Sequence, residues 1–199
     1  MAEDATRTWL EIRGDRFDRM EVHPKPVNVD LGGQRFEVSL RSRRAGNQID
    51  NAFAGRKECW VAQDGVDVGW LDTPPFTATG GEFRGMSTWA DRDEEGNPGV
   101  EGAIGHTRIW LAKPGFALLK WGRTVPITMG VREFRLRGGG RLYENGILVA
   151  RLGAWVPKVA AAADRDLQVL AVLLVASSAR ELVTTRVNQR GASWRGQRY

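Results

Sequence analysis

Residues 164–183 read DRDLQVLAVLLVASSARELV, and this stretch decides the fold of the chain. From position 167 to position 176 every side chain except Gln168 is apolar or alanine. A helix that is apolar all round must be surrounded by other parts of the protein. The run is also shorter than the roughly 20 residues that a membrane-spanning helix needs. It therefore predicts an enclosed C-terminal helix over about 164–186, with Asp164 as its N-cap.

Most of the chain before this helix is typical of strands and turns. Residues 34–40 alternate apolar and polar side chains, as a half-buried strand does. Asp64-Gly65 and Asn145-Gly146 lie between apolar runs and predict tight hairpin turns. Residues 131–137 and 141–144 predict two strands that three glycines connect. A hairpin is also expected from residues 107–111 and 116–121.

Two segments are predicted to be loops, residues 73–84 and 90–105, because both are rich in glycine and proline and the second is strongly acidic. There is no repeat and no clear linker, so residues 1–187 are expected to form one β-rich domain, followed by a basic flexible tail over 188–199. A sheet that curls around the helix would remove it from water, and closure would remove the edge strands. The expected fold is mainly β: a curled or closed antiparallel β-barrel around one buried hydrophobic C-terminal helix.

The sequence RLYENGILVARLGAW, followed closely by the helix, resembles the tubby C-terminal-like superfamily, which includes the phospholipid scramblases and the LURP-one-related proteins. The resemblance covers about the last 70 residues. It implies a β-barrel around a buried C-terminal helix and a membrane-associated binding function. The acidic segment near residues 91–101 and the basic tail have no counterpart in that pattern.

Charge is distributed unevenly along the chain. Residues 1–100 hold 13 basic and 18 acidic side chains, whereas residues 101–199 hold 16 basic and 6 acidic ones. This asymmetry predicts an anionic partner for the C-terminal half. The opening sequence has no apolar segment typical of signal peptides, and Cys59 is the only cysteine, so a cytoplasmic protein without disulfides is expected.

The candidate binding residues are the basic groups of one hairpin and of the tail. Arg135 and Arg137 are two positions apart on a predicted strand and should share a face. Arginine with interspersed aromatic side chains can contact phosphates, lipid headgroups or nucleic-acid bases. The candidates are Arg132, Arg135, Arg137 and Arg141 in the hairpin and Arg186, Arg190, Trp194, Arg195 and Arg198 in the tail.

Other chemistry is less well supported by the residues. Residues 91–97 resemble the opening of a calcium loop, but the twelfth position is Gly102 and not the required Glu. His23 and His106 are too few for a zinc site, and Cys59 is read as a buried small hydrophobe. The glycines at 138–140 precede a strand and not a helix, so they are not read as a phosphate cradle. No cofactor and no metal are predicted.

The leading hypothesis is a non-enzymatic binding or adaptor domain that recognises an anionic partner, phospholipid headgroups at a membrane surface. It would be peripheral to the membrane, with no integral span. The alternatives are a nucleic-acid-associated protein that uses the basic C-terminal arm, a structural subunit of a larger protein assembly, and an enzyme whose pocket the sequence does not reveal.

Overall fold

The computed structural model describes residues 7–14, 26–42, 57–73, 91–92, 98–112, 124–154 and 156–177. These residues form thirteen strands and one helix, which runs over residues 165–177. The strands are β1 (Trp9–Gly14), β2 (Val27–Leu31), β3 (Gln34–Ser42), β4 (Lys57–Gln63), β5 (Val66–Thr73), β6 (Asp91–Arg92), β7 (Pro98–Ile104), β8 (Thr107–Ala112), β9 (Thr124–Met129), β10 (Arg132–Arg137), β11 (Arg141–Glu144), β12 (Ile147–Arg151) and β13 (Lys158–Ala160).

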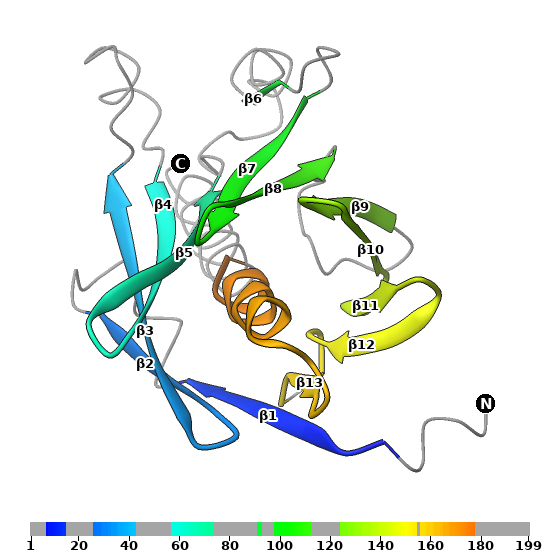
Figure 1. Ribbon diagram of the computed structural model, residues 1–199, viewed down its shortest axis with the longest axis horizontal. Coiled ribbons are helices and arrows are strands. Elements are labelled where there is room, and N and C mark those ends of the chain that lie inside the picture. Colours follow the sequence, from blue (N-terminus) through cyan, green and yellow to red (C-terminus); the bar gives the residue numbers. More distant parts are fainter. Residues whose placement is uncertain are drawn as a thin grey trace, which may run out of the picture.

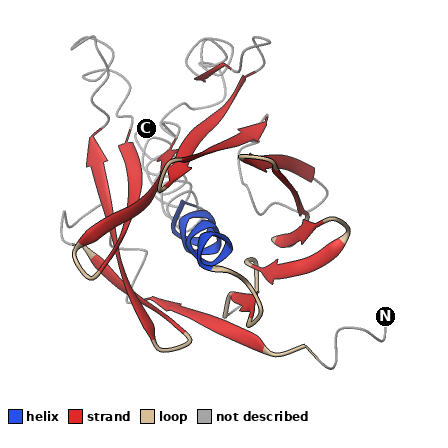
Figure 2. Cartoon of the chain, viewed as in Figure 1, coloured by secondary structure: helices blue, strands red, loops and turns tan. Residues whose placement is uncertain are grey.

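Twelve of these strands close into a ring around the helix, as Figures 1 and 2 show. The ring follows the order β5-β4-β3-β2-β1-β13-β12-β11-β10-β9-β8-β7, and β7 pairs again with β5. All of these pairings are antiparallel. The short strand β6 pairs with the start of β7, beside the point of closure. The predicted closed antiparallel β-barrel around a C-terminal helix is therefore confirmed.

The inner wall of the barrel is built by alternation along each strand. In β9 and β10 exposed and buried positions alternate, and the buried ones include Ile127, Phe134 and Leu136. Successive side chains of a strand point to opposite faces, so each strand lines the core with every second residue. These side chains and the helix form one apolar cluster.

The helix is buried from Leu167 to Ser177, and the side chains from Val169 to Leu174 have no solvent exposure. Gly69 of β5 lets the helix approach the wall, because a Cβ there would lie 3.1 Å from Val169 Cγ1. Gln168, the polar residue in the apolar run, donates a hydrogen bond from Nε2 to the Ala163 carbonyl at 2.9 Å. The Asp164 carboxylate accepts the Leu167 N–H at 2.9 Å, which confirms the predicted N-cap.

The two ends of the barrel differ in their connections. Five two-residue turns join neighbouring strands at the end where the helix begins; they are Gly32-Gly33, Asp64-Gly65, Gly105-His106, Gly130-Val131 and Asn145-Gly146. Asp64 and Asn145 have positive φ angles, as expected for the predicted hairpin turns. We call this end the turn end. The connections 138–140 and 152–157 lie at the opposite end.

The prediction of a loop over residues 90–105 is wrong, because both β6 and β7 lie in that segment. Two of its glycines, Gly99 and Gly102, are required by close packing between strands. A Cβ on Gly99 would lie 2.2 Å from the Trp110 ring, and a Cβ on Gly102 would lie 2.5 Å from the Trp70 carbonyl oxygen. A glycine-rich strand has the composition of a loop, which explains the error.

Some predictions fall outside the described residues. They concern residues 74–84 of the first expected loop, the expected strand over 116–121, the helix after residue 177 and the tail. Among the described residues, no helix combines the length and the hydropathy that crossing a membrane requires.

Candidate anion-binding site

The hairpin of β10 and β11 places arginines on the outer wall of the barrel. Phe134 and Leu136 point to the core, so the alternating residues Arg135 and Arg137 point to the exposed face. Arg137 is the direct cross-strand partner of Arg141, which is also exposed. The predicted shared face of Arg135 and Arg137 is therefore present, and the fold adds Arg141 to it.

This pair belongs to a longer row of cations across four neighbouring strands. Arg141 is opposite Arg151 of β12, and Arg151 is opposite Lys158 of β13. Neighbouring strands lie about 4.8 Å apart, so the four Cα positions span roughly 14 Å. We call Arg137, Arg141, Arg151 and Lys158 the basic row. It runs across the ends of these strands that lie away from the turn end.

Three arginines of this face, Arg135, Arg137 and Arg141, differ from other arginines of the barrel in their ion pairing. Elsewhere on the barrel, arginines pair with acids: Arg13 with Glu11 at 2.6 Å, Arg41 with Asp67 at 2.7 Å and Arg108 with Glu101 at 3.0 Å. Lys158, at the end of the row, reaches Glu11 at 3.1 Å. Within the described part of the chain, Arg135, Arg137 and Arg141 make no such ion pair.

Two members of the basic row lie over aromatic rings. The Arg137 guanidinium carbon is 4.8 Å from the centroid of the Tyr143 ring, and that of Arg151 is 5.4 Å from Trp9. Stacking on a ring face attracts the cation and fixes the plane of the guanidinium, while its N–H groups stay available at the edges. The Tyr143 ring therefore orients the Arg137 guanidinium without neutralising its charge.

The turn between Arg137 and Arg141 packs directly on neighbouring backbone. Gly139 and Gly140 have positive φ angles of 76° and 72°. The Gly140 carbonyl accepts the Leu152 N–H at 2.7 Å, and a Cβ on Gly140 would lie 2.2 Å from the Gly153 nitrogen. Only glycine fits this contact, which ties the β10–β11 hairpin to the end of β12.

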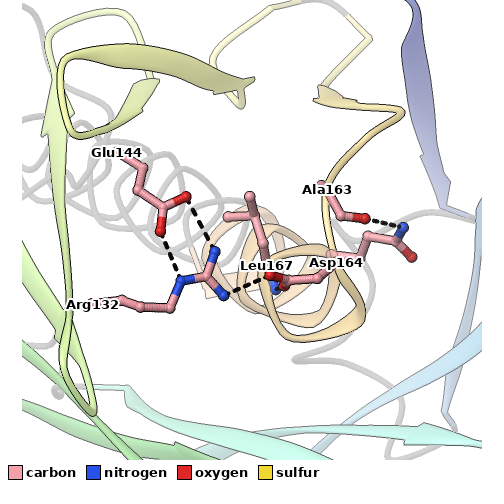
Figure 3. A network of polar contacts seen from close by, with 6 residues as sticks. Arg132, Glu144, Ala163, Asp164 and Leu167 are labelled. Carbon is pink, nitrogen blue, oxygen red and sulfur yellow. Dashed lines mark hydrogen bonds and ion pairs between the residues drawn. The ribbon is translucent and has the colours of Figure 1, made fainter.

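Arg132 is placed differently from the other hairpin arginines. Its guanidinium binds both carboxylate oxygens of Glu144, at 2.7 and 3.1 Å, and reaches Asp164 at the start of the helix at 2.8 Å (Figure 3). The hydrogen bonds to Glu144, and then the one to Asp164, raise the pKa of Arg132 above its ordinary value despite partial burial. These contacts link two hairpins to the helix, whereas Arg135, Arg137 and Arg141 lie outside this network.

The same network affects the acid at the helix start. Burial acts to raise the pKa of Asp164, but hydrogen bonds from the Leu167 N–H and from Arg132 outweigh it. The pKa of Asp164 is therefore lowered, and the carboxylate stays ionised while it caps the helix.

The tail residues Arg186, Arg190, Trp194, Arg195 and Arg198 lie outside the described residues. The fold adds four residues to the predicted set: Arg151, Lys158, Tyr143 and Trp9. Counting outward from the Asn145-Gly146 turn would place Arg151 near Arg141, but a β-bulge between Leu142 and Tyr143 shifts this register. The pairing of β12 with β13 has no local sequence signal.

The other centres considered from the sequence can be located in part. Cys59 is completely buried and belongs to the apolar cluster, as predicted. His106 lies in an exposed turn at the turn end, while His23 is outside the described residues. The described residues contain no group of three or more His, Cys, Asp or Glu side chains arranged to hold a metal ion.

Comparison with protein-family models, curated proteins and solved structures found no match for the chain.

Proposed function

We propose that the chain is a non-enzymatic binding domain that recognises an anionic partner, phospholipid headgroups at a membrane surface. The observation that carries this proposal is a set of exposed arginines on β10 and β11, Arg135, Arg137 and Arg141, that have no carboxylate partner within the described part of the chain. Arg151 and Lys158 extend this set on the next two strands. The barrel provides a rigid frame for this face, and the helix fills its interior.

The expected strength follows from the number of cations. Each basic residue near an anionic lipid surface contributes about 1 kcal/mol, so Arg135, Arg137 and Arg141 together contribute roughly 3 kcal/mol. That free energy corresponds to an increase in partitioning of about 150-fold, which salt should weaken. In this proposal the basic tail adds further contacts through Arg186, Arg190, Arg195 and Arg198. Membership of the tubby C-terminal-like superfamily is part of the same proposal.

Sedimentation with vesicles tests the proposal. The full chain should pellet with phosphatidylcholine vesicles that contain phosphatidylserine, at low salt, and not with phosphatidylcholine alone. The variant Arg135→Glu with Arg137→Glu should lose this binding and keep its fold, because both side chains are on the outer wall.

The matched control is Arg35→Glu with Arg165→Glu, which changes the net charge equally. Arg35 lies near the beginning of β3, and Arg165 lies in the first turn of the helix. Both residues are at the turn end of the barrel, away from the basic row. Equal loss in both variants would indicate net charge alone and remove the hairpin from the proposal. Absence of vesicle binding together with oligonucleotide binding would favour the nucleic-acid alternative.

A further inference from the structure

We infer that Arg137 and Arg141 form a discrete site for a terminal phosphate group, a phosphomonoester, within the face that binds anions. The inference rests on the proposed anion-binding function and names the chemical group that the face recognises. A diffuse positive surface would respond to charge density only, whereas a built site responds to the geometry of its donors.

The register brings the two guanidinium groups to the same place. Arg137 and Arg141 are direct cross-strand partners at the end of the β10–β11 ladder. The Cβ atoms of such a pair lie about 4.5–5.5 Å apart, so both side chains can reach oxygens of one phosphorus atom.

The surroundings limit the freedom of the Arg137 side chain and of the backbone that joins the two arginines. The Arg137 guanidinium lies 4.8 Å from the Tyr143 ring centroid, and Tyr143 is two residues after Arg141 on the same strand and face. The glycine turn that joins the two arginines is fixed by the hydrogen bond from the Leu152 N–H to Gly140. Its three residues carry no side chain, so a ligand can approach the pair from the end of the hairpin.

The donor inventory favours a terminal phosphate over a phosphodiester. A guanidinium presents five N–H donors in a planar fork that matches two oxygens of one phosphate. A phosphomonoester offers three terminal oxygens and a charge of about −1.5 to −2 near neutral pH. A phosphodiester offers two free oxygens and a single charge, so it uses less of what two arginines provide.

The register of the arginines also favours an anion at this place for electrostatic reasons. Like charges directly opposite each other on neighbouring strands destabilise a sheet. Arg141 faces Arg137 on one side and Arg151 on the other, and no ion pair of Arg137 or Arg141 with an acid is found in the described residues. A doubly charged group between Arg137 and Arg141 would remove this repulsion.

Substitutions that keep the charge distinguish a built phosphate site from a diffuse positive surface. The variant Arg137→Lys with Arg141→Lys keeps both charges but loses the planar forks. The full chain is tested on phosphatidylcholine vesicles that contain phosphatidic acid, a phosphomonoester, or phosphatidylserine, a phosphodiester, adjusted to equal zeta potential. We expect the original chain to bind the phosphatidic acid vesicles roughly tenfold more tightly, and the lysine variant to bind both kinds alike.

The control is Arg35→Lys with Arg165→Lys, which should retain the preference. Equal binding of both vesicles by the original chain, or a preference that survives in the lysine variant, would overturn the inference while leaving general anionic binding in place. Thermal unfolding of each variant checks that its fold is intact.

A soluble probe identifies the source of the phosphate and separates this inference from the proposed membrane function. Glycerol 3-phosphate should raise the melting temperature of the original chain and not that of the lysine variant. If this occurs without binding to any vesicle, the phosphate site stands and the membrane function fails. If glycerol 3-phosphate has no effect but the lysine-sensitive preference for phosphatidic acid persists, the site is supported for the lipid-borne group. No effect of glycerol 3-phosphate and no vesicle binding would overturn both.

Discussion

Replacing Leu173 by alanine tests whether the helix is enclosed on every side. Leu173 has no solvent exposure and lies in the middle of the buried run. The change removes three buried carbon atoms, and at about 0.8 kcal/mol each the transfer cost is about 2.4 kcal/mol. The surrounding barrel cannot fully collapse into the space, which adds a cavity cost, so we expect a total loss of about 3–4 kcal/mol.

Urea unfolding followed by tryptophan fluorescence measures this loss. With a slope of about 2 kcal/mol per molar urea, the midpoint should fall by roughly 1.5–2 M. The melting temperature should fall by about 6–16 °C for a chain of this size.

The control is Ile147→Ala, which also truncates an aliphatic side chain but at a position that is 54% exposed. It should cost less than about 1 kcal/mol. If Leu173→Ala and Ile147→Ala unfold at the same midpoint, the helix is not enclosed and the reasoning fails. The stronger change Leu173→Asp buries an unpaired carboxylate and should prevent folding.

Three further predictions concern the turn, the helix cap and the basic row. Gly140→Ala should lower the free energy of unfolding, measured in urea, by at least about 3 kcal/mol, because it adds a backbone clash to the strain of a positive φ. The control Gly33→Ala, which has a positive φ but open space around the added Cβ, should lower it by only about 1–2 kcal/mol. The lowered pKa of Asp164 means that the folded state binds fewer protons than the unfolded state, so its contribution is present above about pH 4 and is lost as the pH falls through the lowered value. The difference in unfolding free energy between the original chain and Asp164→Asn should therefore shrink in acid, and a difference that stays constant from neutral pH to about pH 2 would contradict this account. Arg141→Gln should stabilise the phosphate-free protein by about 0.2–1 kcal/mol at low salt, and the gain should fade near 1 M salt, where charges are screened; a destabilised variant in thermal melts would show that the row is not repulsive.

Features with a local cause could be predicted from the sequence. The apolar run around Leu170 required an enclosed helix, and Asp64 and Asn145 adopt the positive φ angles that tight hairpin turns need. The strand β7 was missed because Gly99 and Gly102 are explained only by the side chains and backbone packed on them. Ring closure was expected, but the pairing of Trp9 with Ala160 joins distant segments that share no local pattern.

In the candidate site, too, some features have a local cause in the sequence and others depend on the pairing of distant strands. Alternation along one strand places Arg135 and Arg137 on one face, which is a local property. The neighbours Arg151 and Lys158 enter through strand pairing and through a β-bulge that shifts the register. Arg132 precedes these arginines on the same strand, but its contacts with Glu144 and Asp164 depend on where the helix begins in space.

The position of the helix has a consequence for how the chain acquires its structure during synthesis. The helix over residues 165–177 follows all thirteen described strands in the sequence, yet it supplies the centre of the core. Ring closure likewise waits for residues near Ala160 to meet those near Trp9. Until the ribosome has made the helix, the inner faces of the earlier strands have no packing partner, and such species are prone to aggregate. Folding should therefore be slow and should wait until the helix has left the ribosome, with the nascent barrel as a substrate for chaperones.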